Sequence, residues 1–165
     1  MERTISSKAK IRYLILGYYQ IIGGVIGILL NIYGFFTQLP VFGLVIIIPV
    51  IFFILYGFSI YCGTKCLQFG ENSLNVSIYN QVFQILGFSM FGAVFSYVAG
   101  LHFNINLDLS NSIQANFKAG ISNFKLYYNQ DPDVIKVNLN LIAIGLIIFI
   151  DKLNSTSKKE KEALK

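Results

Sequence analysis

The stretch IRYLILGYYQIIGGVIGILLNIYGFF, residues 11–36, is the part of the sequence that most clearly indicates the fold. At steps of three and four it carries small or polar residues, and the positions between them are mostly Ile, Leu, Val, Tyr or Phe. Lipid tails are as apolar as leucine, so helices in a membrane associate through close backbone contact at small residues and through carboxamide hydrogen bonds. The pattern therefore predicts a membrane helix that packs through Gly17, Gln20, Gly24, Gly27, Asn31 and Gly34.

The composition favours several membrane spans. Of the 165 residues, 55% are hydrophobic and 13% are charged, whereas a soluble domain is about 25% charged. A transmembrane helix needs about 20 apolar residues, and three runs of that order contain no Asp, Glu, Lys or Arg. With a fourth run near the C-terminus, the sequence predicts an all-α membrane protein. We expect a four-helix transmembrane bundle with spans at 12–36, 40–63, 78–101 and 132–153.

The basic residues predict an orientation. Of the 13 Lys and Arg residues, four precede residue 13, one is Lys65, and five lie from Lys152 onward, mostly in a tail at 154–165. Lys and Arg accumulate on the cytoplasmic side of membrane spans. Both termini are therefore predicted in the cytoplasm, with the protein integral to the inner membrane. The lipid bilayer is the expected partner, and the net charge of +5 does not predict a nucleic-acid partner.

The third predicted span carries a second row of small and polar residues at the same spacing. We expect this row to be the packing partner of the first span. Its members are Gln84, Ser89, Gly92, Ser96 and Ala99.

Residues 102–130 differ from the runs before them, because apolar and polar residues alternate, with turn residues between the alternating blocks. Period two predicts three short antiparallel strands, an extracytoplasmic β-meander between helices three and four. An amphipathic interfacial helix is the alternative. The apolar face of such a meander needs a cover, so we predict that it meets a partner, either another membrane protein or a second copy, through Phe103, Ile105, Ile113, Phe117 and Ile121.

The fourth predicted span begins at Asp131, Pro132 and Asp133, because Asp is a good helix cap and Pro suits the first helical position. The alternation from Ile135 to Leu141 also permits a fourth strand. A helix is preferred, because 132–153 is long enough to cross a bilayer and 141–153 is not.

Two runs carry a family resemblance: YQIIGG at 19–24 and NLIAI at 140–144. They resemble runs of small, uncharacterised four-span membrane proteins of bacteria. The resemblance implies the same four-span fold over most of the chain, and no function comes with it.

No motif predicts a chemistry, so we expect no catalytic residue, no metal and no cofactor. Cys62 and Cys66 lie one helical turn apart and supply only half a tetrahedral metal site, so we interpret them as buried thiols. The single histidine, His102, has no nearby partner for a triad and is expected to pack at the membrane interface.

Three classes of function were weighed. The first is a non-enzymatic accessory, assembly or scaffold subunit that packs through the small-residue rows. The second is an oligomeric channel or transporter for small solutes that uses intramembrane Gln20, Asn31 and Gln84. The third is a membrane enzyme, but no group of residues in the sequence has the spacing of a catalytic site. Copurification with a larger complex would favour the first, and solute flux would favour the second.

Overall fold

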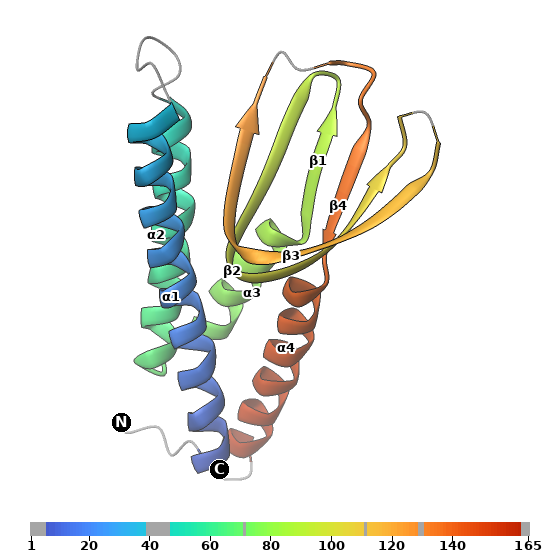
Figure 1. Ribbon diagram of the computed structural model, residues 1–165. Coiled ribbons are helices and arrows are strands. Elements are labelled where there is room, and N and C mark those ends of the chain that lie inside the picture. Colours follow the sequence, from blue (N-terminus) through green and yellow to red (C-terminus); the bar gives the residue numbers. More distant parts are fainter. Residues whose placement is uncertain (1–5, 39–46, 71, 111, 129–130, 163–165) are drawn as a thin grey trace.

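The structure is a computed structural model that describes residues 6–38, 47–70, 72–110, 112–128 and 131–162. Over these residues the elements are α1 (Ser7–Gln38), α2 (Ile47–Leu67), α3 (Ser73–Ile85), β1 (Leu86–Met90), β2 (Ala93–Asp108), β3 (Gln114–Tyr127), β4 (Lys136–Asn140) and α4 (Leu141–Glu162). The strands form one antiparallel sheet that lies above α3 and α4 and beside the upper part of α1 and α2 (Figure 1). The fold is therefore α+β, and the predicted all-α four-helix transmembrane bundle is wrong.

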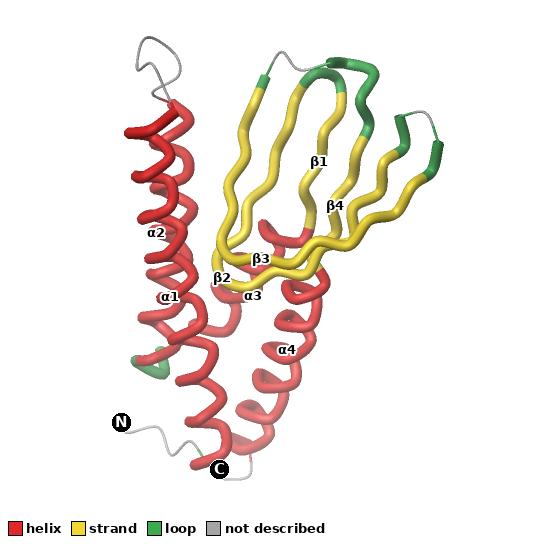
Figure 2. Tube along the Cα trace, in the orientation of Figure 1, coloured by secondary structure: helices red, strands yellow, loops and turns green. Residues whose placement is uncertain are grey.

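Two of the described helices, α1 and α2, are long and apolar enough to cross a membrane. Their candidate spans are Ser7–Gly34, with a mean hydropathy of 1.8, and Ile47–Leu67, with a mean hydropathy of 1.9. Figure 2 shows the two helices side by side along one flank of the molecule. They correspond to the first two predicted spans, although the predicted start of the second span lies outside the described residues.

The predicted third span, 78–101, is not one helix. Helix α3 ends at Ile85, and β1 and β2 follow it as a hairpin. The hairpin turns at Phe91 and Gly92, whose φ angles of 53° and 74° are both positive, as a type I′ turn requires. The small and polar residues of this run fit a helical spacing, but a mostly apolar run without charged residues does not by itself distinguish a helix from a strand. Its richness in Phe, Val and Tyr, which favour strands, was the signal against a long helix.

The predicted fourth span, 132–153, is also divided between a strand and a helix. Helix α4 begins at Leu141 because the Oδ1 of Asn140 accepts hydrogen bonds from the amides of Ile142 (3.1 Å) and Ala143 (3.4 Å), which makes Asn140 the cap. Asp131, the predicted cap, instead accepts a hydrogen bond from the Asp133 amide at 3.0 Å, within a turn. The alternation before residue 141 marks β4, so the strand alternative was correct.

The sheet bends in the middle of β2. Strand β1 pairs with the first half of β2, β4 pairs with its second half, and β1 also pairs with β4. Strand β3 follows β2 on its other edge, with an irregularity between Val98 and Leu101. Gly100, with φ of 106°, occupies this bend. The predicted three strands of 102–130 are thus the second half of β2 and one continuous β3, and both belong to a larger sheet.

The bend of the sheet is fastened to α1. The hydroxyl of Ser122 on β3 accepts a hydrogen bond from the Gly100 amide (3.0 Å) and donates one to the Gly23 carbonyl (2.8 Å). A Cβ on Gly23 would lie 2.5 Å from the Gly100 nitrogen, so only glycine allows this approach. A buried cluster of Phe52, Tyr56, Tyr97 and Ala99 continues the contact between α2 and the sheet.

A second buried cluster joins the other ends of the helices. It contains Ala9, Tyr13 and Leu16 of α1, Cys66 of α2, Leu74 of α3, and Ile150 and Leu153 of α4. The first cluster packs the sheet against α2, and the second packs the four helices against one another.

Candidate functional site: a polar groove in the sheet

The concave side of the bent sheet forms a polar groove with a volume of about 420 Å³. All four strands contribute to it, and Figure 1 shows the strands rising on both sides of the bend. The polar lining residues are Ser89, Ser96, His102, Asn104, Asn106, Asp108, Asn116, Lys118, Asn123, Lys125, Lys136 and Asn138.

The alternation of the strands explains this lining. Successive side chains of a strand point to opposite faces, so Asn104 and Asn106 face the groove while Phe103 and Ile105 between them face outward. On β3, Lys118 lies in the groove lining, and its neighbour Phe117 is 66% exposed and stacks on Phe103 with ring centroids 5.9 Å apart. In this half of the sheet the polar face therefore lines the groove and the apolar face is exposed, the reverse of a sheet that covers a soluble core, whereas in the other half Tyr97 and Ala99 pack against α2.

The groove carries an excess of positive charge. Lys118, Lys125 and Lys136 line it, and Asp108 is the one carboxylate among the described lining residues. Asp108 is already paired, because its Oδ2 lies 2.9 Å from the Nζ of Lys136. Two lysines are left without a carboxylate among the described residues of the groove. Such a surface attracts anions.

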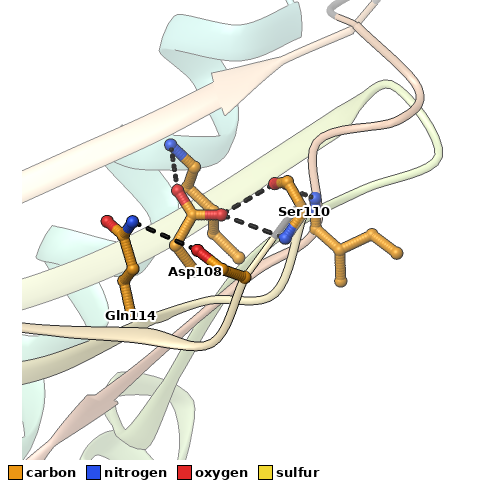
Figure 3. Close-up of polar contacts among 6 residues, drawn as sticks. Asp108, Ser110 and Gln114 are labelled. Carbon is orange, nitrogen blue, oxygen red and sulfur yellow. Dashed lines mark hydrogen bonds and ion pairs between the residues drawn. The ribbon is translucent and has the colours of Figure 1, made fainter.

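Asp108 also organises the turn after β2 (Figure 3). Its Oδ1 accepts hydrogen bonds from the Ser110 amide (3.1 Å) and hydroxyl (2.7 Å). The Lys136 ammonium and the two Ser110 donors lower the pKa of Asp108 to about 2, so the carboxylate is charged at any physiological pH. The charge of Lys136 is therefore permanently offset.

His102 lies deep in the groove, 5% exposed. It sits opposite Gly120 in the β2–β3 register, and a Cβ on Gly120 would lie 2.8 Å from the imidazole Cε1. Burial lowers the pKa of His102 below its ordinary value, and the charges of Lys118 and Lys125 lower it further. His102 is therefore neutral at neutral pH, and it is a groove residue instead of the membrane-interface residue that was predicted.

Asn104 is the other deep polar residue, 7% exposed. It is paired with Lys118 on β3 and with Asn140 on β4. Among the described residues, neither Asn104 Oδ1 nor His102 Nδ1 has a hydrogen-bond partner. A buried polar atom without a partner costs free energy, so each one calls for an explanation.

The polar surface continues from the groove along the buried side of α3. The Oε1 of Gln84 accepts a hydrogen bond from the Ala99 amide of β2 (2.8 Å), and Asn80 donates to Ser59 (3.2 Å). Further along, Ser77 donates to Gln20 Oε1 at 3.2 Å. The outward side of α3 is instead apolar: Tyr79 is 62%, Val82 48% and Phe83 53% exposed.

The first small-residue row packs against α2 over most of its length. Cβ atoms built on Gly17 and Gly24 would lie 2.9 Å from the carbonyl oxygens of Gly63 and Tyr56 respectively, and one on Gly27 would overlap the Tyr56 ring. Gln20 is fully buried there. At the end of the row, Asn31 donates to the Gly27 carbonyl of its own helix and also forms a side-chain hydrogen bond with Tyr56 of α2, whereas a Cβ on Gly34 would meet no described atom within 4 Å.

The second row does not pack on the first as a helix, because most of it lies in strands. Gln84 lies in α3, Ser89 in β1, Gly92 in the hairpin turn, and Ser96 and Ala99 in β2. Ser89 and Ser96 line the groove. Ala99 lies at the bend of β2, and a Cβ built on Gly23 of α1 would lie 2.7 Å from the carbonyl carbon of Ala99.

The predicted partner surface lies on the outward face of the sheet. Phe103 is 40%, Ile113 83%, Phe117 66% and Ile121 52% exposed, whereas Ile105 is half-buried. A partner for this surface stays a prediction. Cys62 and Cys66 are buried free thiols, and no group of three or more His, Cys, Asp or Glu in the described part of the chain could hold a metal.

Sequence reasoning missed the groove, although its signal was present. The sequence analysis assigned a role only to the apolar face of the alternating strands and none to the polar members, such as Asn104 and Asn106. Nothing in the linear pattern showed that Lys118, Lys125 and Lys136 would converge. No protein-family model, curated protein or solved structure matches this chain, so the resemblance to four-span bacterial proteins stays a prediction.

Proposed function

We propose that this chain is an integral membrane protein that binds a small anionic solute in the groove of its sheet. The observation that carries the proposal is the pair of lysines, Lys118 and Lys125, in a concave polar site whose described carboxylate is already neutralised by Lys136. The volume of about 420 Å³ suits a small molecule. The proposal is of a binding protein and includes no chemical step.

The exposed apolar side chains of α3 and of the second half of the sheet support the membrane location. In water, exposed residues such as Phe83 and Phe117 would raise the free energy of the folded state, because their apolar surface stays hydrated. Beside lipid the same arrangement is favourable, since apolar side chains face the hydrocarbon and polar ones face inward. The two helices that are able to cross a membrane, α1 and α2, support the same location.

The orientation follows from the positions of the basic residues. The start of α1 and the end of α4 lie together, at the end of the molecule away from the sheet (Figure 1). Lys8 near the start of α1, Lys65 in the last turn of α2 and Lys152 in α4 lie toward that end. The positive-inside bias then gives cytoplasmic termini and a groove on the opposite side of the inner membrane.

Calorimetric titration of the full-length protein in mild detergent at low salt tests the proposal. Succinate and inorganic phosphate should bind, and the size-matched cation 1,4-diaminobutane should not. Replacing both groove lysines, Lys118→Gln and Lys125→Gln, should weaken anion binding by about fivefold per lysine, since each charge contributes about 1 kcal/mol near water. The control, Lys8→Gln with Lys152→Gln, removes the same charge outside the groove. Equal weakening in both variants, or no anion binding at all, would refute the proposal.

A second candidate function, passage of the solute through the protein, is favoured by the polar buried face of α3. This face leads from Gln84 at the sheet to Ser77 and Gln20 among the helices. Flux of succinate into vesicles that contain the protein, lost in Gln20→Leu, would support it. An accessory or assembly role stays a prediction, which copurification from the native membrane tests.

A further inference from the structure

Charged side chains lie near the opening of the groove, and uncharged polar side chains lie at its base. The lysine side chains of β3 lie toward the open side, since Lys118 is exposed and Lys125 half-buried. Asn104 and His102 lie at the base, 7% and 5% exposed. A small ligand that reaches the base therefore meets positive charge at one end and uncharged polar atoms at the other.

The atom at the base that matters most is an acceptor. Asn104 Oδ1 has no hydrogen-bond partner among the described residues, and a carboxamide oxygen can only accept. A carboxylate or a halide offers acceptors alone, so it cannot satisfy this oxygen. A hydroxyl on the ligand can donate to it. Sites built to hydrogen-bond a substrate hydroxyl discriminate strongly against the analogue that lacks it, because the buried polar group is then left unpaired.

The register places the two interactions within reach of one small molecule. Asn104 and Lys118 are directly paired across β2 and β3, and directly paired residues of antiparallel strands have Cβ atoms about 5 Å apart. A carboxylate on the lysine and a hydroxyl on the adjacent carbon fit that separation. Asn140 of β4, paired with Asn104 on the other side, uses its Oδ1 for the cap of α4, and no described donor bonds to the Asn104 oxygen.

We infer that the solute bound in the groove is a hydroxylated organic anion, whose carboxylate contacts Lys118 and Lys125 and whose hydroxyl donates to Asn104 Oδ1. This inference rests on the proposed anion-binding function and names its ligand class. His102 lines the same base, and its unpaired Nδ1 provides a second polar contact for the ligand.

Two matched pairs of acids test the inference by calorimetric titration of the full-length protein in mild detergent: malate against succinate, and lactate against propionate. Each pair differs only by one hydroxyl. At least one enantiomer of a hydroxy acid should bind about tenfold tighter than its partner, which corresponds to about 1.4 kcal/mol. This comparison in the wild-type protein needs no variant.

Two variants then assign the effect. Asn104→Leu should remove the preference for the hydroxy acid and leave the affinity for the plain acid within about twofold, and Lys118→Gln should weaken both acids equally. If Asn104→Leu does not fold, Asn104→Asp, which keeps the acceptor and the size, should keep the preference while weakening both acids. Equal affinities within both pairs, alongside binding of phosphate or succinate, overturn the inference and leave the proposed function standing. Absence of binding by every anion overturns both.

Discussion

The close approach of α1 and α2 makes a quantitative prediction about Gly17. A Cβ added there would lie 2.9 Å from the backbone carbonyl oxygen of Gly63 and 2.7 Å from Cδ2 of Leu67. The leucine can move, but the carbonyl belongs to the facing helix. Gly17→Ala must therefore push the two helices apart by a few tenths of an ångström or more.

The magnitude follows from a matched substitution in the same helix. At Gly34 an added Cβ would meet no described atom within 4 Å. Both changes gain about the same helix propensity, about 1 kcal/mol, which cancels in the comparison. What remains is the overpacking cost, about 1–3 kcal/mol. For a chain of this size that difference corresponds to about 2–12 °C in Tm.

Thermal unfolding of both variants in the same mild detergent, followed by circular dichroism, measures this difference. Gly34→Ala should unfold at or above the wild-type temperature, and Gly17→Ala should unfold clearly below Gly34→Ala. Gly63→Ala, whose Cβ would lie 2.6 Å from the Gly17 carbonyl oxygen, should behave like Gly17→Ala. Equal unfolding temperatures for Gly17→Ala and Gly34→Ala would show that α1 and α2 do not approach each other in this way.

Three further predictions concern the groove and the helix interior. Asp108→Asn keeps an acceptor for Ser110 but releases the charge of Lys136, so succinate affinity in calorimetric titration should rise about two- to fivefold; an unchanged affinity would place Lys136 outside the ligand's reach. The folded-state pKa of His102 is lowered, so the unfolded chain takes up the proton first, and the free energy of unfolding should fall as pH drops through about 6.5. Denaturant titrations at pH 8 and pH 5 should show that loss, and it should shrink in His102→Gln; a loss of equal size in that variant would contradict the assignment. Gln81 is 1% exposed, and its carboxamide has no partner among the described residues, so Gln81→Leu should leave denaturant stability unchanged or raise it by about 1 kcal/mol. A large loss of stability would mean that the carboxamide makes an interaction in the membrane.

The two halves of the chain differ in how far their structure could be predicted. In α1, the glycines at steps of three and four lie among large apolar residues, so the sequence predicted both the helix and the face through which it packs. In 86–101 most residues are apolar or small, and the spacing of Ser89, Gly92, Ser96 and Ala99 fits one face of a helix. A buried hairpin can carry the same residues, so this spacing and the length of the run favoured a helix that the structure does not contain.

The polar groove illustrates what a linear pattern does and does not contain. Alternation in 102–108 is local, because successive side chains of a strand point to opposite faces, and the sequence alone therefore located the strand and its two faces. Which face points inward is not local. In a soluble sheet the apolar face covers the core, whereas here Phe103 and Phe117 face outward and Asn104 faces the groove. The sequence by itself determined the two apolar helices and the row of small residues on the first, whereas the tertiary structure decided that this row packs against α2 and not against the predicted third span. Only the tertiary structure decided that Lys118, Lys125 and His102 share one site, because the bend at Gly100 and the pairing of β4 with β2 bring together residues whose separation in the chain carries no periodic signal.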